Sequence, residues 1–225
     1  MAFDRASARQ FAMLTDQSAS TADATTGPTA ELTADQLPER ATFTSMDVST
    51  REEWLRIGVE TSRNQPRVAD NVLGLLRSLE SIEDGFVTNQ LVHCLQTATL
   101  AERAGASEEI VVASLCHDIG KAISVPNHPA IAASILKPYV SDDVHFMIAA
   151  HQDFQGRHYY HHFGGDRNAR NQYAGNPAYG LAEQFADEWD QKAFDPNGDT
   201  LPLEHFEPMV RRVFAKPRTA IGSGS

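Results

Sequence analysis

Apolar side chains recur at three- and four-residue steps through most of this chain, and this spacing restricts it to helices. Val68, Val72 and Leu75 show the pattern, which places apolar side chains on one face of an α-helix. Alternation of apolar and polar residues, which is typical of half-buried strands, extends over only a few residues at a time. The sequence therefore predicts an all-α fold, a bundle of helices around one core.

Capping and helix-breaking residues divide this pattern into separate elements. Gly105 ends one expected helix, and Ser107 and Ser141 have side chains suited to N-caps. Pro126 breaks the chain between two further helices. The expected helices span residues 52–62, 66–79, 88–104, 109–123, 131–136, 142–154, 177–194 and 203–214.

Composition changes along the chain and predicts its domain organisation. Between Gln17 and Asp35 the only large apolar side chain is that of Leu32, which is too little to offset the entropy of ordering the segment. We therefore expect a disordered or poorly ordered leader at 1–45. The helical bundle is expected at 46–217, followed by a flexible tail at 218–225.

The charge of the chain excludes some classes of partner. Acidic residues outnumber basic ones by 30 to 19, a formal net charge of −11, and such a field repels phosphate backbones. Nucleic acid is therefore not an expected partner. No apolar run reaches the roughly 20 residues that a membrane-spanning helix needs, so no membrane association is expected.

The two cysteines, Cys94 and Cys116, lie within apolar helical patterns and are interpreted as buried thiols in a reducing compartment. The first residues lack the basic start and apolar stretch of a secretory signal. We therefore expect a cytoplasmic protein. The oligomeric state is left open.

A histidine and an aspartate interrupt the most apolar helical segment of the chain. His117 and Asp118 follow directly on the run Val111 to Cys116. Burying an uncompensated carboxylate in such surroundings costs several kcal/mol, and a metal ion compensates it well. Adjacent side chains on a helix point about 100° apart. One divalent ion can therefore hold His117 while Asp118 reaches a second ion or bridges both.

Four further polar residues follow or interrupt apolar helical runs in the same way. Together with the pair they form the series His93, His117, Asp118, His128, His151 and Asp190. Imidazole and carboxylate ligands in this number can hold two transition-metal ions and leave positions open for water, dioxygen or substrate. One expected site takes His93, His117, Asp118 and Asp190. The other takes the shared Asp118 with His128 and His151.

This series resembles the HD-domain superfamily, whose defining feature is the adjacent histidine and aspartate, here His117 and Asp118. The resemblance covers residues 93–190 and in outline 49–214. It implies an all-α bundle with a dinuclear metal centre. Most members of the superfamily resemble metal-dependent phosphohydrolases, and a smaller branch consists of mixed-valent di-iron oxygenases.

Three segments are most similar to the oxygenase branch, which includes inositol oxygenase and an organophosphonate oxygenase. They are residues 89–98, 102–109 and 115–120, and Trp189-Asp190-Gln191-Lys192 resembles the end motif of the phosphonate enzyme. The resemblance implies an Fe(II)/Fe(III) pair, with manganese or zinc as alternatives. It also implies dioxygen and a small hydroxylated substrate, whose C–C or C–P bond is cleaved. A phosphohydrolase acting on a phosphate ester or nucleotide, and a non-catalytic metal-bound sensor or scaffold, remain alternatives.

The chain departs from the phosphonate oxygenase at four positions. Glu83 and Phe86 stand where that relative has a tyrosine and a glutamate that guard the open iron. Gln155 and Asp187 replace the lysine and arginine that grip its phosphonate. A doubly charged phosphonate would lose two cationic partners here, so that substrate is not expected.

Lys121 follows the histidine–aspartate pair at the place where inositol oxygenase has a lysine that contacts its substrate. We expect Asp118 and Lys121 to be catalytic, and we interpret Lys121 equally well as an exposed lysine at a helix end. The expected substrate contacts are Lys121, Gln155, His158, Tyr159 and Arg167. Rival ligands are His145, His205, Asp187 and Asp195, none of which has the apolar context of the six.

Overall fold

The computed structural model describes residues 36–218. Within them the chain forms two compact units, one ending at Arg67 and one spanning Val68–Arg218. Residues 1–35 of the expected leader and 219–225 of the expected tail lie outside the described residues. The predicted limits of the bundle, 46–217, stay a prediction.

The first unit contains the short 3-10 helix η2 (Met46–Val48) and the helix α2 (Arg51–Asn64). Thr50 and Glu53 form a capping box, in which each side chain bonds the backbone N–H of the other residue. The second carboxylate oxygen of Glu53, Oε1, accepts hydrogen bonds from the backbone N–H groups of Thr42 and Phe43, at 2.7 and 3.2 Å. Glu53 thereby ties the preceding segment to the start of α2.

These bonds make the first unit sensitive to acid. The backbone N–H groups of Thr42 and Thr50 lower the pKa of Glu53 from 4.5 to about 2. A lowered folded-state pKa means that the contribution is complete above about pH 4.5 and is lost as the pH falls towards 2. We expect Glu53→Gln to speed hydrogen exchange at the amides of Thr42 and Phe43 at neutral pH. The control Glu52→Gln alters a neighbouring charge in the same turn, and equal exchange in both variants would contradict this account.

The second unit is all helical, and between residues 36 and 218 no β-strand occurs. The predicted all-α fold is therefore confirmed. Its main helices are α3 (Arg67–Ser78), α4 (Gln90–Arg103), α5 (Glu108–Cys116), α6 (His128–Leu136), α7 (Asp142–Tyr159), α8 (Tyr179–Gln184) and α9 (Leu203–Val213). None of the helices in this described part is long and apolar enough to cross a membrane.

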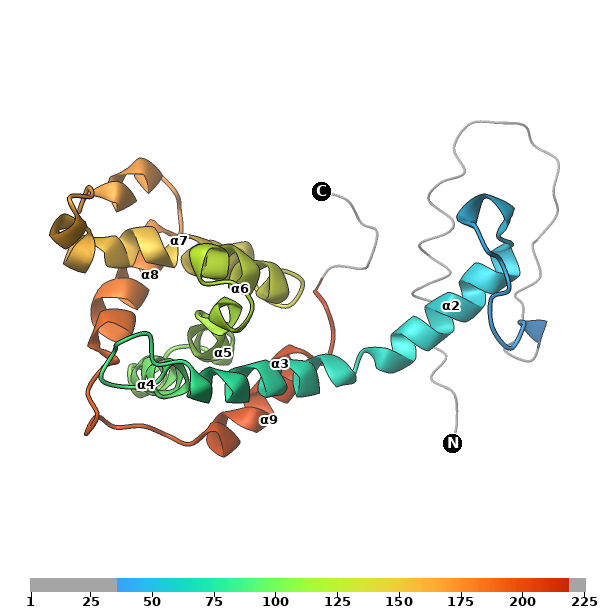
Figure 1. Cartoon of the computed structure of the whole chain (residues 1–225), viewed down its shortest axis with the longest axis horizontal. Helices are drawn as coiled ribbons and strands as arrows, with labels where there is room; N and C mark the ends of the chain where they lie inside the picture. Colours follow the sequence, from blue (N-terminus) through green and yellow to red (C-terminus); the bar gives the residue numbers. More distant parts are fainter. Residues whose placement is uncertain (1–35, 219–225) are drawn as a thin grey trace. The chain divides into compact units, whose positions relative to one another are not determined.

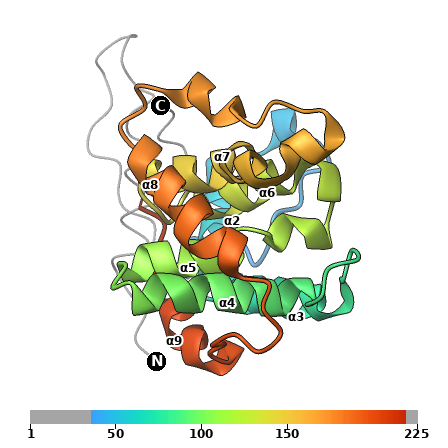
Figure 2. The same cartoon turned by 90° about the vertical axis from the view of Figure 1, so that its left-hand side faces the viewer.

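The helices of the second unit pack around α5 and α7. Helix α4 lies along α5, α6 and α8 pack against α7, and α9 covers α5 (Figures 1 and 2). Leu115 of α5, Met147 and Phe154 of α7 and Phe185 beyond α8 are all fully buried. Polar side chains that project inward from α4, α5 and α7 therefore meet in one core.

Three predicted helices differ from the observed ones where the chain approaches the buried polar residues. The helix expected at 109–123 ends at Cys116, and a 3-10 helix, η4 (Ile119–Ala122), follows after Asp118. The break occurs because Asp118 has φ −101° and ψ 6°, outside the helical range. The helix expected at 142–154 continues to Tyr159. The helix expected at 177–194 divides into α8, a π-helical turn η8 (Phe185–Trp189) and a 3-10 helix η9 (Asp190–Lys192).

Candidate metal centre

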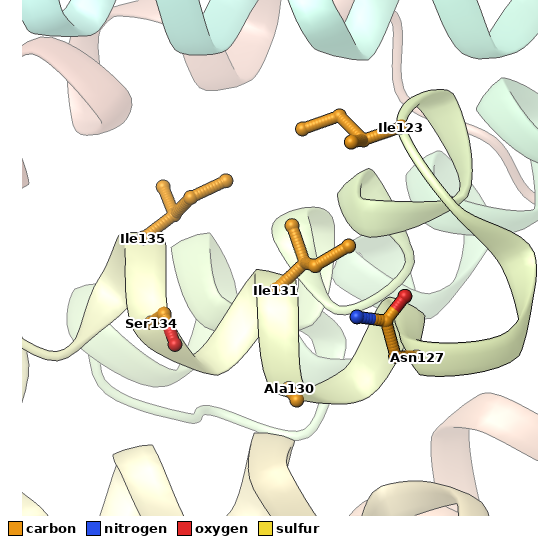
Figure 3. Close-up of a pocket in the computed structure, with 6 residues that line it drawn as sticks. All are labelled: Ile123, Asn127, Ala130, Ile131, Ser134 and Ile135. Carbon is orange, nitrogen blue, oxygen red and sulfur yellow. The ribbon is translucent and has the colours of Figure 1, made fainter.

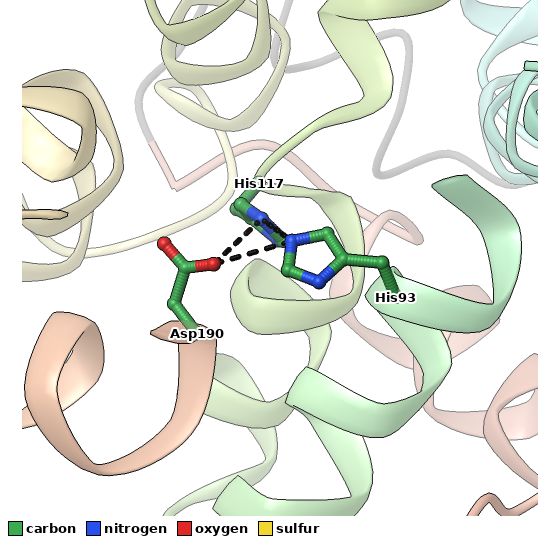
Figure 4. Close-up of side chains that lie close together, drawn as sticks. All are labelled: His93, His117 and Asp190. Atoms are coloured by element: carbon green, nitrogen blue, oxygen red, sulfur yellow. Dashed lines mark hydrogen bonds and ion pairs between the residues drawn. The ribbon is translucent and has the colours of Figure 1, made fainter. Parts of the chain in front are cut away.

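The six residues that the sequence singled out lie together in the core of the second unit. They come from five elements and none is more than 7% exposed: His93, His117, Asp118, His128, His151 and Asp190. We call them the His–Asp cluster. Figure 4 shows three of them, His93, His117 and Asp190, whose side chains point towards one another from different segments.

Each imidazole of the cluster has its Nδ1 atom at a backbone carbonyl oxygen. The partners of His93, His117, His128 and His151 are the carbonyls of Ala193, Ser114, Val125 and Ile148, at 2.7 to 3.0 Å. A carbonyl only accepts, so Nδ1 carries the proton and donates. In the neutral ring the lone pair is then on Nε2, which is the arrangement that metal-binding histidines show.

The four Nε2 atoms converge in two pairs. Nε2 of His93 lies 3.0 Å from Nε2 of His117, and Nε2 of His128 lies 3.3 Å from Nε2 of His151. When both rings of a pair are neutral, their Nδ1–H bonds leave two Nε2 lone pairs directed at each other. Such an arrangement repels unless a proton or a cation lies between the nitrogens.

Asp118 stands between the two pairs and presents one oxygen to each. Its Oδ2 lies 3.6 and 3.4 Å from Nε2 of His93 and His117, and its Oδ1 lies 3.0 and 3.5 Å from Nε2 of His128 and His151. Asp190 adds its Oδ1 to the first pair, 3.2 Å from His93 and 3.6 Å from His117. We call His93, His117, Asp190 and Oδ2 of Asp118 the first side, and His128, His151 and Oδ1 of Asp118 the second side.

Both carboxylates are held in the charged form. Burial alone raises the pKa of Asp118, but His117, His128 and His151 outweigh it and lower this pKa well below its usual range. The pKa of Asp190 is lowered in the same way, because His117 and His93 outweigh its burial. Burial lowers the pKa of His117, which favours the neutral ring, whereas at His151 burial is outweighed by the bond to Asp118 and by its charge, and the pKa is raised.

The donors of the cluster fit divalent metal ions. Oδ1 of Asp118 and Oδ2 of Asp190 are buried and accept no hydrogen bond from the described residues. A buried acceptor without a partner costs folding free energy, and so does a pair of lone pairs directed at each other. A cation on each side of Asp118 would remove both costs. Two groups of three donors, His93-His117-Asp190 and His117-Asp118-His151, have ligand atoms within 4.8 Å of one another.

Lys121 contacts the cluster from the turn that follows Asp118. Its Nζ lies 2.7 Å from Oδ2 of Asp118 and donates to Oε1 of Gln90 at 2.9 Å. Burial lowers the pKa of Lys121, but the charge of Asp118 outweighs it and the pKa is raised. The ammonium also lies 5.7 Å from the ring centre of Phe86. The ammonium is thus anchored at the centre, and its partner Gln90 could not be predicted from the sequence.

The other residues expected to contact substrate occupy different surroundings. Nε2 of Gln155 donates to Oδ1 of Asp190 at 3.1 Å, and His158 pairs with Asp187 at 2.9 Å. Tyr159 is half-buried, and burial together with the charge of Asp190 raises its pKa. Arg167 is exposed. The substrate contacts of these four residues stay a prediction.

Three of the four rival ligands have partners outside the cluster. His205 pairs with Glu102 at 2.9 Å, Asp195 accepts from the N–H of Asn197, and Asp187 pairs with Arg170. His145 lies on α7, and burial lowers its pKa beside the charges of Lys137 and Asp142.

An apolar groove lies along α6 and the turn before it. Its volume is about 410 Å³, and it is lined by Ile123, Asn127, Ala130, Ile131, Ser134 and Ile135 (Figure 3). None of these side chains carries a charge or belongs to the cluster. The groove therefore offers no chemistry for the centre.

Comparison with known proteins places the cluster within one domain. Residues 91–192 match the family model of the HD domain, and all six cluster residues fall within the match. This match supports the predicted relation to the HD-domain superfamily, and the matched residues lie within the helical second unit. No curated protein matches the chain.

Proposed function

We propose that this chain is a dinuclear metalloenzyme, most simply a di-iron oxygenase that cleaves a C–C or C–P bond of a small hydroxylated substrate. The observation that carries the proposal is the arrangement around Asp118. One pair of imidazole Nε2 atoms lies at each of its two carboxylate oxygens, and the carboxylate of Asp190 lies beside the first pair. The HD-domain match agrees with it, because HD domains are commonly metal-dependent enzymes.

The two sides of Asp118 would hold one ion each. His93, His117, Asp190 and Oδ2 of Asp118 would hold the first, and His128, His151 and Oδ1 of Asp118 the second. The second side has fewer protein ligands, which leaves room for substrate or water. Iron in this ligand set supplies one-electron chemistry with dioxygen, whereas the protein supplies binding, orientation and exclusion of water.

The charges around the centre favour a neutral alcohol over a phosphate dianion. Lys121 is the cation that contacts the cluster, and it is already paired with Asp118. Arg170 and His158 both pair with Asp187. Lys121 would orient a substrate oxygen from its fixed position. Phe194 stacks on His93 with ring centres 4.2 Å apart and on Phe86 at 5.1 Å, and this stack shields the first side from water.

Protein produced in iron-replete cells tests the proposal. We expect close to two metal ions per chain and a mixed-valent EPR signal after partial oxidation. We also expect one member of an alcohol panel to perturb the signal and to stimulate dioxygen consumption. A protein that retains only zinc or manganese, and gives no such signal, would argue against the oxygenase.

A phosphohydrolase is the second candidate, and Lys121 is the observation that favours it. Its ammonium could hold a phosphate beside the metal ions, which lower the pKa of a bound water. Release of phosphate from nucleotides or phosphate esters with Mn(II), without dioxygen consumption, would select this candidate. Bound metal without turnover in either assay would select the non-catalytic sensor or scaffold.

A further inference from the structure

Asp190 follows an irregular stretch of helix. The π-helical turn Phe185–Trp189 precedes it, and the 3-10 helix Asp190–Lys192 starts with it. Single π turns are rare, and many are found at functional sites. The side chains that support this turn determine where the Asp190 carboxylate points.

A buried arginine provides one part of this support. Arg170, from the 3-10 helix Ala169–Tyr173, is 6% exposed. Its Nη1 lies 3.1 and 3.0 Å from the two carboxylate oxygens of Asp187, and its Nη2 lies 3.2 Å from Glu183. Charged side chains are rarely this buried unless paired, and charge-assisted bonds of this kind are strong. Arg170 thus fixes both α8, through Glu183, and the π turn, through Asp187.

A stripe on α7 provides the other part. His151, Gln155 and His158 follow at steps of four and three residues, so they share one helix face. Each meets a different carboxylate: His151 faces Asp118, Gln155 donates to Asp190, and His158 pairs with Asp187. The π turn is therefore tied to α7 at Asp187, and Asp190, directly after the turn, is tied to α7 through Gln155.

We propose that Arg170 and Asp187 are positioning residues of the metal centre. They hold the π turn so that Asp190 faces His93 and His117, and they act on the first side through Asp190. This inference rests on the proposed function, because it presupposes that the cluster holds metal. No ligand of the second side comes from this stretch of chain. Loosening the turn should therefore lower the affinity for the ion on the first side and leave the affinity for the other ion unchanged.

Titration of the metal-free full chain with Zn(II) against a chromophoric chelator tests this inference. We expect Arg170→Met to weaken one of two ions by roughly 10- to 100-fold, the range typical of partners that orient metal ligands. Arg170→Lys keeps the charge without the planar fork and should restore part of the affinity. Asp187→Asn should act in the same direction as Arg170→Met. Asp190→Asn should weaken the same ion further.

The matched control is Arg212→Met, which breaks an exposed pair with Glu108 that has comparable geometry. It should leave both zinc affinities at the wild-type value. Wild-type affinities in both Arg170→Met and Asp187→Asn would overturn the positioning role while leaving the metal centre intact. Equal weakening of both ions would also overturn it, because that result indicates a general loss of structure. A wild-type chain that binds no zinc would overturn the proposed function and this inference together.

Discussion

Asp118→Asn should abolish the binding of both metal ions, the largest effect that we expect from any single substitution. The side chain contributes one oxygen to each side of the cluster, and an amide lacks the negative charge that each ion needs. Loss of a partner outside the ligand set already costs roughly 10- to 100-fold in affinity, so loss of a shared ligand should cost more. Metal analysis after dialysis measures the result directly.

A stability measurement gives the same prediction a second readout. A ligand present at 100 times its Kd stabilises the folded state by about 2.7 kcal/mol. Added metal should therefore raise the Tm of the wild-type chain and leave that of Asp118→Asn unchanged. The control Asp199→Asn alters an exposed carboxylate paired with Arg103 and should respond like wild type. Retention of two ions by Asp118→Asn, with helical content unchanged by circular dichroism, would refute a bridging role.

Gly120→Ala should destabilise the second unit and displace His128. A Cβ atom at Gly120 would overlap the carbonyl oxygen of His128 and would lie 2.7 Å from its Cα. Both neighbours are backbone atoms, so the contact can be relieved only if η4 and the start of α6 move apart. We expect a loss of about 1–3 kcal/mol in the free energy of unfolding, the usual cost of overpacking, together with weaker metal binding on the second side.

The control for this substitution is Gly74→Ala in α3. No atom lies within 4 Å of the Cβ that would be added there. Alanine should stabilise a helix interior by roughly 0.5–1 kcal/mol relative to glycine. Urea denaturation of both variants measures the difference. A Gly120→Ala protein as stable as wild type would show that the close approach of the two segments is not needed.

The helices could be predicted from the sequence because their signals are local. The recurrence of Val68, Val72 and Leu75 predicts α3, in which Val72 is buried and the other two pack partly buried against the core, and Ser141 caps α7 as expected. The ends of the helices near the cluster could not be predicted. Helix α5 ends at Cys116 although the apolar pattern continues to Ile123, because the backbone leaves the helical range at Asp118, and no apolar pattern signals this change.

The cluster could be predicted because its members are polar residues in apolar surroundings. His93, His117 and His151 each adjoin buried apolar residues, and the structure brings all three to Asp118. The groups that orient them leave no comparable signal. The acceptors for His93 and His117 are the backbone carbonyls of Ala193 and Ser114, and the side chains of these two residues do not indicate the hydrogen bonds.

Arg170 was missed for a different reason. In the sequence it is one of several basic residues in a polar segment, and it is buried where that segment packs against α7 and pairs with Glu183 of α8. Gln155 and His158 were expected to contact substrate, and the structure shows their polar atoms bonded to Asp190 and Asp187. A sequence shows which groups are polar, but not which of them the fold has already paired.

Anomalous diffraction from crystals of iron-loaded protein tests the central claim most directly. The account predicts two iron peaks on opposite sides of Asp118, one beside His93, His117 and Asp190 and the other beside His128 and His151. A single peak, or none within this cluster in protein shown to be folded, would contradict it.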